Sequence, residues 1–485
     1  MLKQHTDFDA VIVGSGPNGL AAAIALQQHG LAVLLLEGKA QIGGGLRTEE
    51  FTLPGFKHDV CSAIHPLSAG SPFFKTLPLE DFGLEYIYPP VAAAHPFDDG
   101  HAAALFGSAQ QTAIKLGIDC KPYLNLVKPL ERNFTKLAPD LLGPLHFPKY
   151  PVKFARFGLN AIPSALQMAK KFRTKEARGL WAGMAAHGIQ PLSNWATSAV
   201  ALVLLATGNT KGWPMPKGGS IKIADALAAY FVSLGGKIET DFEVKSLRQL
   251  PSSKTVLFDI TPKQLLKIAG HQFSPLYQWQ LEKYRYGMGV FKVDWALDAP
   301  IPFSAHECRQ AGTIHLGNTL EEIALGEKQT SEGKTVQKPF VLLAQQSIFD
   351  STRAPEGKHT AWAYCHVPNG SKTDMTNSIE QQVERFAPGF RERILAKHTM
   401  DTAQIEAYNP NYIGGDINGG ILDIRQLFTR PALRWSPYKT SAKGLYICSS
   451  STPPGGGVHG MCGYYAAKRA LKEVFGLKAS KLSYV

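Results

Sequence analysis

The chain lacks paired cysteines and long apolar runs. Its 485 residues contain only six cysteines, and none of them forms a C-x-x-C pair. This excludes a zinc knuckle of the usual spacing and a thioredoxin-type redox pair, and it favours a reduced, intracellular protein without a metal site. No run of about 18 apolar residues is present, so we expect no membrane-spanning helix. The polar first residues show no secretory signal, which predicts a cytoplasmic location.

The composition also excludes a disordered or fibrous protein. Hydrophobic residues make up 44% of the chain and charged residues 19%, and the 46 glycines fall in clusters without the period of collagen. At about 150 residues per domain, the length predicts two or three domains with large buried cores.

The net charge of +12 is concentrated in residues 145–180, where eight basic residues stand against the single acid Glu176. These charges alternate with aromatic and aliphatic side chains. Such a segment suits an anionic membrane surface at least as well as nucleic acid. A solvated helical face over the core explains the same pattern equally well. We expect no nucleic-acid partner, and peripheral contact with an anionic membrane is one of two hypotheses for this segment.

The beginning of the chain has the pattern of a dinucleotide-binding βαβ unit. Residues 8–13 form an apolar run of strand length, and a glycine-rich turn at 14–19 follows. An alanine- and leucine-rich stretch predicts a helix up to about His29, and a second apolar strand at 31–36 ends at Glu37. Strand, glycine turn, helix, strand and acid occur here in the order that dinucleotide binding requires.

Each residue of this unit has a predicted task. Gly14 permits the tight turn, Gly16 lets the backbone approach a pyrophosphate, and Gly19 lets the helix pack closely against the strand. The helix N-terminus offers free N–H groups to the phosphates, and Glu37 is placed to accept hydrogen bonds from ribose hydroxyls. The predicted cofactor-binding residues are therefore Gly14, Gly16, Pro17, Asn18, Gly19 and Glu37.

A second glycine cluster at 43–45 precedes Leu46, Arg47 and Thr48. A nicotinamide enzyme needs no such cluster, whereas a larger cofactor whose chain passes beneath the loop does. The order GxGxxG, acid, GG and Arg-Thr resembles the FAD-binding signature of glutathione-reductase-like flavoproteins, in particular the branch with phytoene desaturases, carotenoid isomerases and amine oxidases. The resemblance implies FAD as the cofactor and adds Gly44, Gly45 and Arg47 to the predicted site.

Two later stretches resemble the same family. Residues 213–220 precede a predicted helix at 221–234 and a predicted strand at 235–244, and the resemblance implies that Val244 on that strand offers its backbone to the adenine. Asp259, Thr261 and Pro262 match the family pattern "D.tP". The motifs "RAPEGKHTAW" and "GGDINGG" extend the resemblance to phytoene-dehydrogenase-like oxidoreductases over nearly the whole chain.

The C-terminal region predicts a strand at 444–448, a loop at 449–457 and a helix to about Phe475. In the resembling family this loop lies against the isoalloxazine ring, and the helix N-terminus faces the flavin O2 carbonyl. The resemblance thus adds Gly457, His459, Gly460 and Met461. Many relatives carry Gly-Asp before the loop, whereas this chain has Ser449 and Ser450, so the carboxylate contact is missing.

The chain contains one complete GxGxxG, so we expect no stable NAD(P) site and an external electron acceptor such as oxygen, a quinone or a protein carrier. Three residues are candidates for catalysis. His459 is a candidate base or ring contact, and satisfaction of loop carbonyls explains it equally well. Lys292 and Asp294 share one face of a predicted strand at 289–297, which could aim an ion pair into the active site, as a lysine does in amine oxidases. A surface cross-strand ion pair is the favoured alternative for these two residues.

The expected fold is α/β, with a glutathione-reductase-like, Rossmann-type FAD domain and an interleaved α+β substrate domain that carries a helical lid. The FAD domain would comprise residues 1–69, 213–286 and 409–485, and the substrate domain residues 70–212 and 287–408. The first functional hypothesis is hydride transfer from an apolar substrate, such as an isoprenoid or polyene, to flavin N5. A flavin-dependent isomerase, a flavin amine oxidase and a non-catalytic binding protein remain as alternatives.

Overall fold

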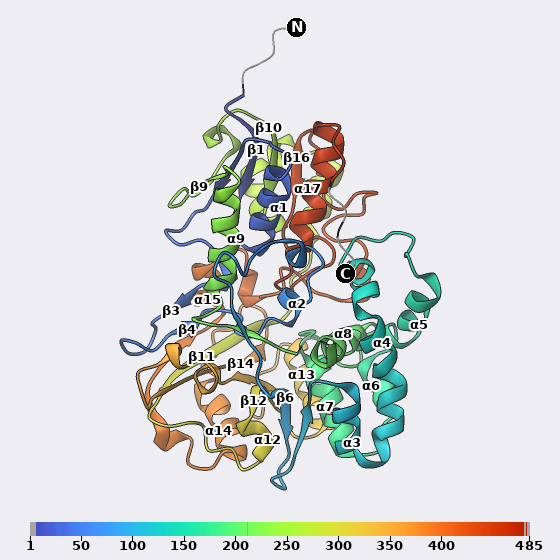
Figure 1. Cartoon of the computed structure of the whole chain (residues 1–485), viewed down its shortest axis with the longest axis vertical. Helices are drawn as coiled ribbons and strands as arrows, with labels where there is room; N and C mark the ends of the chain where they lie inside the picture. The colour runs from blue at the N-terminus through green and yellow to red at the C-terminus, as the bar shows by residue number, and fades with distance from the viewer. Residues whose placement is uncertain (1–5, 211, 480–481, 483–485) are drawn as a thin grey trace.

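The computed structural model describes residues 6–210, 212–479 and 482, and two sheets define its architecture (Figure 1). The first sheet is parallel throughout, in the order β16-β10-β1-β2-β9. Its central strands are apolar runs that helices cover on both faces, which is why they show no polar alternation. The strands are β1 (Phe8–Val13), β2 (Val33–Leu36), β9 (Lys237–Glu239), β10 (Ser253–Phe258) and β16 (Leu445–Ile447).

Helices α1 (Pro17–Gln27), α9 (Ile221–Ser233) and α17 (Met461–Val474) lie side by side on one face of this sheet (Figure 1). They share one apolar core with β1 and β2. On the other face lie α10 (Pro262–Ala269) and α11 (Pro275–Glu282). α1 can start directly after the glycine turn because Pro17 occupies a position whose N–H needs no helical partner.

The second sheet has the order β15-β11-β14-β13-β12-β6-β7 and is antiparallel except for the pair β12–β6. Alternate side chains contribute to two different cores, one on each face. Its strands are β6 (Val91–Pro96), β7 (Ala102–Leu105), β11 (Gly289–Leu297), β12 (Ala311–Leu316), β13 (Val341–Ala344), β14 (His359–Val367) and β15 (Ile394–Met400).

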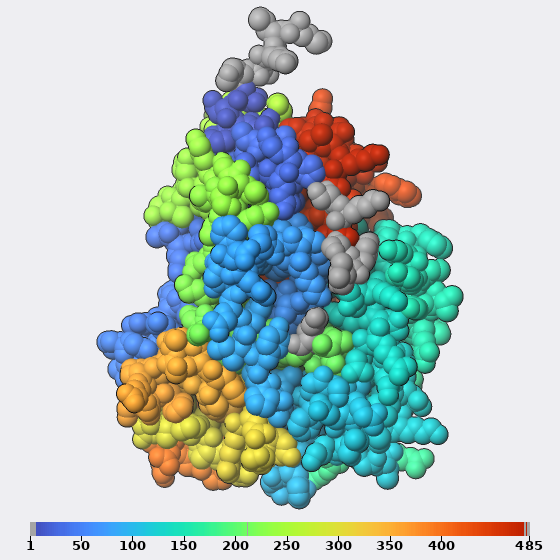
Figure 2. Space-filling view, viewed as in Figure 1, coloured from blue at the N-terminus to red at the C-terminus, as the bar shows by residue number. Residues whose placement is uncertain are grey.

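A helical lobe covers one face of the second sheet and appears as the cyan and teal part of Figure 2. It contains α3 (Ala109–Lys115), α4 (Cys120–Leu141), α5 (Pro151–Ala161), α6 (Ala165–Ala169), α7 (Lys175–Ala186) and α8 (Thr197–Thr210). α13 (Leu320–Ser331) packs on α7 at the same face, and α12 (His306–Arg309) and α14 (Thr376–Phe386) cover the opposite face. No helix in the described ranges is both long and apolar enough to cross a membrane.

Shorter elements connect these layers. β3 (Thr48–Glu49) pairs with β4 (His58–Asp59), and β5 (Tyr86–Ile87) pairs with β8 (Met215–Pro216). The short helices are α2 (Pro66–Ala69), α15 (Thr402–Tyr408) and α16 (Ile424–Leu427).

The strands of the first sheet come from three separate stretches of the chain, and those of the second sheet from the stretches between them. The domain boundaries given above stay predictions. One element is corrected: the strand predicted at 235–244 ends at Glu239, so Val244 lies beyond it. After Glu239 the chain turns at Asp241, which has a φ of +56° and ends the pairing with β2.

Candidate active site

A cavity of about 820 Å³ opens at the carboxyl edge of the five-stranded sheet. Val13, Leu36 and Ile260 line it just where β1, β2 and β10 end. From there the cavity continues to α8 and the seven-stranded sheet, where Val203 and Trp362 line it. Open α/β sheets bind their ligands outside the carboxyl ends of the strands, so this is the place where a cofactor is expected. We call its two parts the nucleotide end and the substrate end.

The glycine turn forms the wall of the nucleotide end. Gly14 has a φ of +99°, and its N–H donates to the carbonyl of Leu36 at 2.8 Å. A Cβ on Gly16 would lie 2.7 Å from Asp259 Oδ2. A Cβ on Gly19 would lie 2.0 Å from the carbonyl oxygen of Gly14, so α1 can approach the turn only without a side chain there. Gly14, Gly16, Pro17 and Asn18 line the cavity, whereas Gly19 serves the packing of helix on turn.

Glu37 is surrounded by donors of the protein itself. Its Oε2 accepts hydrogen bonds from the backbone N–H and the hydroxyl of Ser15. Its Oε1 accepts one from the N–H of Lys39 at 3.0 Å and one from Arg47 Nη2 at 3.2 Å. Glu37 and Arg47 are both buried and form an ion pair at the cavity wall. Because these donors use the lone-pair positions of the carboxylate, the contact of Glu37 with ribose hydroxyls stays a prediction.

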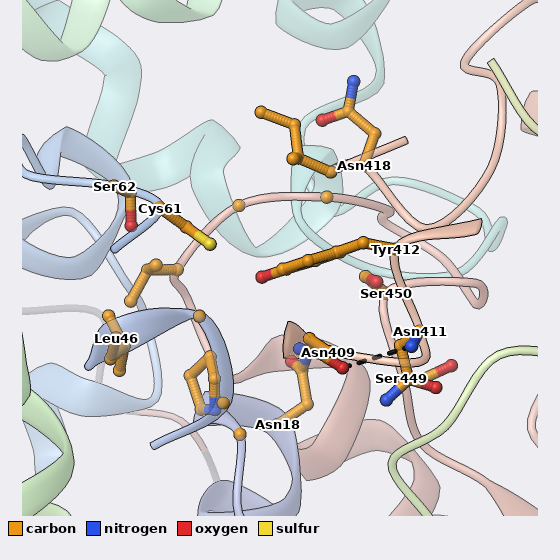
Figure 3. Close-up of a pocket in the computed structure, with 18 of the residues that line it drawn as sticks. Asn18, Leu46, Cys61, Ser62, Asn409, Asn411, Tyr412, Asn418, Ser449 and Ser450 are labelled. Carbon is orange, nitrogen blue, oxygen red and sulfur yellow. Dashed lines mark hydrogen bonds between the residues drawn. The ribbon is translucent and has the colours of Figure 1, made fainter. Parts of the chain in front are cut away.

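The second glycine cluster lies between the first turn and the opposite wall. A Cβ on Gly44 would lie 3.2 Å from the Cα of Gly16, and one on Gly45 would lie 2.2 Å from the Tyr412 hydroxyl. Figure 3 shows the Tyr412 ring lying across the cavity, with its hydroxyl directed towards Cys61. Gly44, Gly45 and Arg47 all line the cavity, and Val244 lines it as well, although from a loop and not from a strand.

His459 caps its own helix at the far side of the cavity. The N–H of Met461, the first residue of α17, donates to His459 Nδ1 at 3.0 Å. Since Nδ1 accepts, the neutral ring carries its proton on Nε2, and burial lowers the pKa of His459 to about 4. Nε2 has no hydrogen-bond partner among the residues that the structure describes. In this tautomer His459 offers the cavity an N–H donor, which suits contact with a bound group better than proton abstraction.

Gly457 and His459 line the cavity, and Gly460 and Met461 lie behind them in the protein core. Gly460 has a φ of +67°, and a Cβ there would meet Phe74 and Ala21. Gly460 and Met461 therefore place the start of α17 against α1. The C-terminal loop contributes to the cavity through residues 449, 450 and 456–459.

Lys292 and Asp294 form a buried ion pair, so the favoured expectation of a surface pair is wrong. The sheet is covered by helices on both faces here, which a pattern of alternating residues does not reveal. The Lys292 ammonium lies over the Phe51 and Trp362 rings, 5.6 Å and 5.8 Å from their centroids. Lys292 lines a small cleft beside the main cavity, whereas Asp294 lies behind it.

The Lys292–Asp294 pair has two histidine neighbours. His58 Nδ1 lies 3.6 Å and His398 Nδ1 3.7 Å from the Asp294 carboxylate. Although burial favours the neutral acid, the Lys292 charge and the bond from His398 hold the pKa of Asp294 below its usual range. Burial lowers the pKa of His58 to about 4. The pair is therefore a stable zwitterion at the edge of the substrate end.

Asp259 is a functional candidate that the sequence analysis placed only within a family pattern. It follows β10, lines the cavity and accepts a hydrogen bond from the Gly19 N–H at 2.8 Å through Oδ2. Burial, together with the neighbouring charge of Glu37, raises the pKa of Asp259 to about 7. The charge beside the phosphate-binding turn therefore changes near neutral pH.

A polar wall opposite the glycine turn was also missed. Asn409, Asn411 and Asn418 line the cavity together with Ser449 and Ser450 (Figure 3). Asn411 Oδ1 accepts from the Thr261 N–H at 2.8 Å, and Asn409 Oδ1 accepts from the Asn411 N–H at 3.1 Å. The available signal was the run of three asparagines within 409–418, next to the "GGDINGG" motif.

The residues present fit a dinucleotide cofactor. Two buried polar atoms of residues that line the cavity, Asn18 Oδ1 and His459 Nε2, have no partner within the described ranges. Side chains at Gly14 and Gly16 would fill the approach to the helix N-terminus. FAD would therefore be held by the glycine turn, Asn18 and the Glu37–Arg47 pair at one end and by the loop 456–459 at the other. When bound, it would supply a hydride acceptor.

Comparisons with known proteins agree with this geometry. Residues 12–77 match the family model of the NAD(P)-binding Rossmann-like domain. The pyridine nucleotide-disulfide oxidoreductase domain-containing protein 2 of Mus musculus is 24% identical, over 96% of this chain and 94% of its own. One of the subunits of limonene dehydrogenase from Castellaniella defragrans is 23% identical, over 98% and 96%. The lycopene-forming phytoene desaturase of a Paracoccus species is 22% identical, over 94% and 95%.

Solved structures share the fold. An oxidoreductase from Methanosarcina mazei superposes with a TM-score of 0.66 at 15% identity, covering 96% of this chain and all of that one. A putrescine oxidase variant superposes with a TM-score of 0.60 at 15% identity, covering 97% and 99%.

The fold and the cavity define the chain as an FAD-dependent oxidoreductase with a Rossmann-type nucleotide-binding domain. Its similarity to desaturases and dehydrogenases runs from end to end. Within the class, the chain belongs to the phytoene dehydrogenase-like family.

Proposed function

We propose that the protein removes hydride from an apolar substrate, of isoprenoid or polyene type, and passes it to FAD. The observation that carries the proposal is the continuity of the cavity from the glycine turn to an apolar chamber. Aliphatic side chains of α8 and aromatic and aliphatic ones of the seven-stranded sheet surround this chamber. Its apolar lining includes Ile189, Ala199, Val200, Val203, Leu204, Trp213, Leu342 and Trp362.

The chamber is suited to a neutral hydrocarbon. Within the described residues, the carboxylates that line the cavity are Glu37, Glu243 and Asp259, and all three belong to the nucleotide end. An ammonium substrate would lose its hydration in the chamber without a carboxylate to replace it. Two full-length relatives are named for limonene and phytoene, both of them hydrocarbons, which supports the same choice.

Three side chains are proposed to serve the reaction. Apolar walls exclude water and hold the substrate against the cofactor. His459 would donate its Nε2–H to the cofactor, and the Lys292–Asp294 pair, at the cleft beside the chamber, would take up the proton that leaves the neighbouring carbon. The electrons would then pass to an external acceptor, oxygen or a quinone.

The test starts from the purified protein. Solvent extraction and mass spectrometry identify any co-purifying hydrocarbon, and anaerobic addition of that compound should bleach the visible absorbance of the flavin. A product without bleaching would show an isomerase, and hydrogen peroxide formed from amines would show an amine oxidase. Failure of every apolar compound to bind would overturn the proposal.

We also propose that the helical lobe contacts an anionic membrane, from which such a substrate would be collected. α5 and the loop before it lie at the edge of the molecule (Figure 1). Four apolar side chains are largely exposed there: Leu145 (69%), Phe147 (85%), Val152 (82%) and Leu159 (77%). Lysines and an arginine alternate with them, as in helices that lie in a bilayer interface.

A further inference from the structure

One face of the seven-stranded sheet forms the floor of the substrate end, and polar groups lie at both sides of that floor. In the strand register Lys292 pairs with Tyr364, Tyr364 with Leu342, and Leu342 with His315. This row crosses β11, β14, β13 and β12. Three strand spacings separate its ends, which is about 14 Å. The Lys292–Asp294 pair marks one side of the floor, and Thr313 and His315 of β12 mark the other.

The hydroxyl of Thr313 lacks a partner. Thr313 lines the cavity, its side chain is 1% exposed, and its Oγ1 has no hydrogen bond within the part of the chain that the structure describes. A buried hydroxyl without a hydrogen bond costs free energy of folding, and native proteins satisfy nearly all such groups. An unpartnered hydroxyl in a ligand cavity therefore indicates a partner supplied by the ligand.

His187 extends this polar spot. It ends α7, lines the cavity, and its Nε2 lies 2.8 Å from His315 Nε2. The Trp213 ring packs against it edge to face, with centroids 5.6 Å apart. Burial lowers the pKa of His187 to about 3 and that of His315 well below its usual range, so both rings are neutral. The nearby Glu327 carboxylate is engaged with His366 Nδ1 at 2.8 Å.

We propose that Thr313 and His187 form a subsite for an uncharged polar group, an alcohol or a carbonyl, at one end of an otherwise apolar substrate. The inference rests on the proposed function and names its substrate class more closely: an oxygenated isoprenoid-like molecule rather than a plain hydrocarbon. A neutral hydroxyl and a neutral imidazole can exchange hydrogen bonds with such a group but cannot compensate a charge. The subsite would place the opposite end of the substrate towards Lys292.

The test compares two probes that differ in one hydroxyl, all-trans-farnesol and β-farnesene, on the flavin-containing protein. Binding is measured through the fluorescence of Trp213 and Trp362, which line the cavity. Wild-type protein should bind farnesol about tenfold more tightly than farnesene, as one hydrogen bond predicts. Thr313→Val keeps the volume and removes only the hydroxyl, so the preference should fall to about twofold or less while farnesene binds as before. His187→Phe should reduce the preference in the same way.

Thr360→Val is the matched control. Thr360 is also a buried threonine with an unpartnered hydroxyl on this sheet, but it lies outside the residues that line the cavity. Its replacement should leave the farnesol preference unchanged. Equal affinities of both probes for the wild type, or an unchanged preference in Thr313→Val, would overturn the subsite and leave the proposed function standing. Failure of both probes to bind would overturn the proposed function and the subsite together.

Discussion

At the nucleotide end of the cavity the backbone makes most of the surface, whereas at the substrate end side chains make it. Gly14, Gly16, Gly44 and Gly45 bring main chain to the cavity wall within one stretch of sequence. The substrate end is lined by side chains of α7, α8 and three strands that lie far apart in the chain. A surface made of glycine backbone tolerates almost no added atom. A surface made of side chains can change its shape and polarity by substitution and thus can serve different substrates on one fold.

The largest effect is expected from one added methyl group. Gly19→Ala should lower the free energy of unfolding by about 3 kcal/mol or more, because the new Cβ would overlap the Gly14 carbonyl oxygen. Gly158→Ala in α5 is the matched change in the helical lobe, where a Cβ meets nothing within 4 Å. It should stabilise by about 0.5–1 kcal/mol through helix propensity. Urea unfolding followed by circular dichroism measures both, and equal effects would contradict the contrast between the two regions.

The next effect concerns the buried ion pair of the nucleotide end. Glu37→Ala should weaken FAD binding by about 1.5–3 kcal/mol through lost charged hydrogen bonds. It should also lower stability by about 3 kcal/mol, because Arg47 is left buried without its partner. Glu243→Ala removes an exposed carboxylate that lines the same end, and it should change neither quantity by more than about 0.5 kcal/mol. Flavin titration and thermal unfolding distinguish these outcomes.

A third prediction concerns pH. Asp259 has a pKa of about 7 in the folded protein, against an ordinary value of 3.8 for an aspartate, so the folded state holds more protons than the unfolded chain between these two pH values. Stability therefore falls as pH rises through this window, by up to about 1.4 kcal/mol per pH unit for this one group. Asp259→Asn should remove that part of the slope, so the variant gains on the wild type between pH 5 and pH 7. Parallel stability profiles of the two proteins would contradict the assignment.

The smallest effect is expected at the surface. Replacing Phe147, Val152 and Leu159 by serine should reduce co-sedimentation with anionic liposomes several-fold, at unchanged fold stability. The matched control replaces Leu276 and Trp279 of α11, which are exposed by 65% and 55% on the other domain. Binding of the wild type should weaken as salt rises, since the Debye length shrinks from about 10 Å at 0.1 M. Equal loss in both variants, or no binding by the wild type, would make the lobe an ordinary surface.

The sequence predicted the nucleotide end more completely than the substrate end. A glycine turn between two strands has its geometry encoded in consecutive residues, so Gly14, Gly16, Asn18 and Glu37 could be named in advance, and all four line the cavity. The Lys292–Asp294 pair was placed correctly on one strand face but wrongly at the surface. Its burial depends on helices that are distant in the chain.

By itself, the sequence determined the local elements: the βαβ unit, the second glycine cluster and the helix that follows His459. Only the tertiary structure decided what faces them. It brought Asp259 to the start of α1, Tyr412 across Gly45, and Thr313 next to His187 at the end of an apolar chamber. The physical reason is range, because turn and helix geometry follow from neighbours in the chain. A cavity wall, in contrast, and the pKa or unmet hydrogen bond of a residue in it, depend on segments that meet only when the chain is packed.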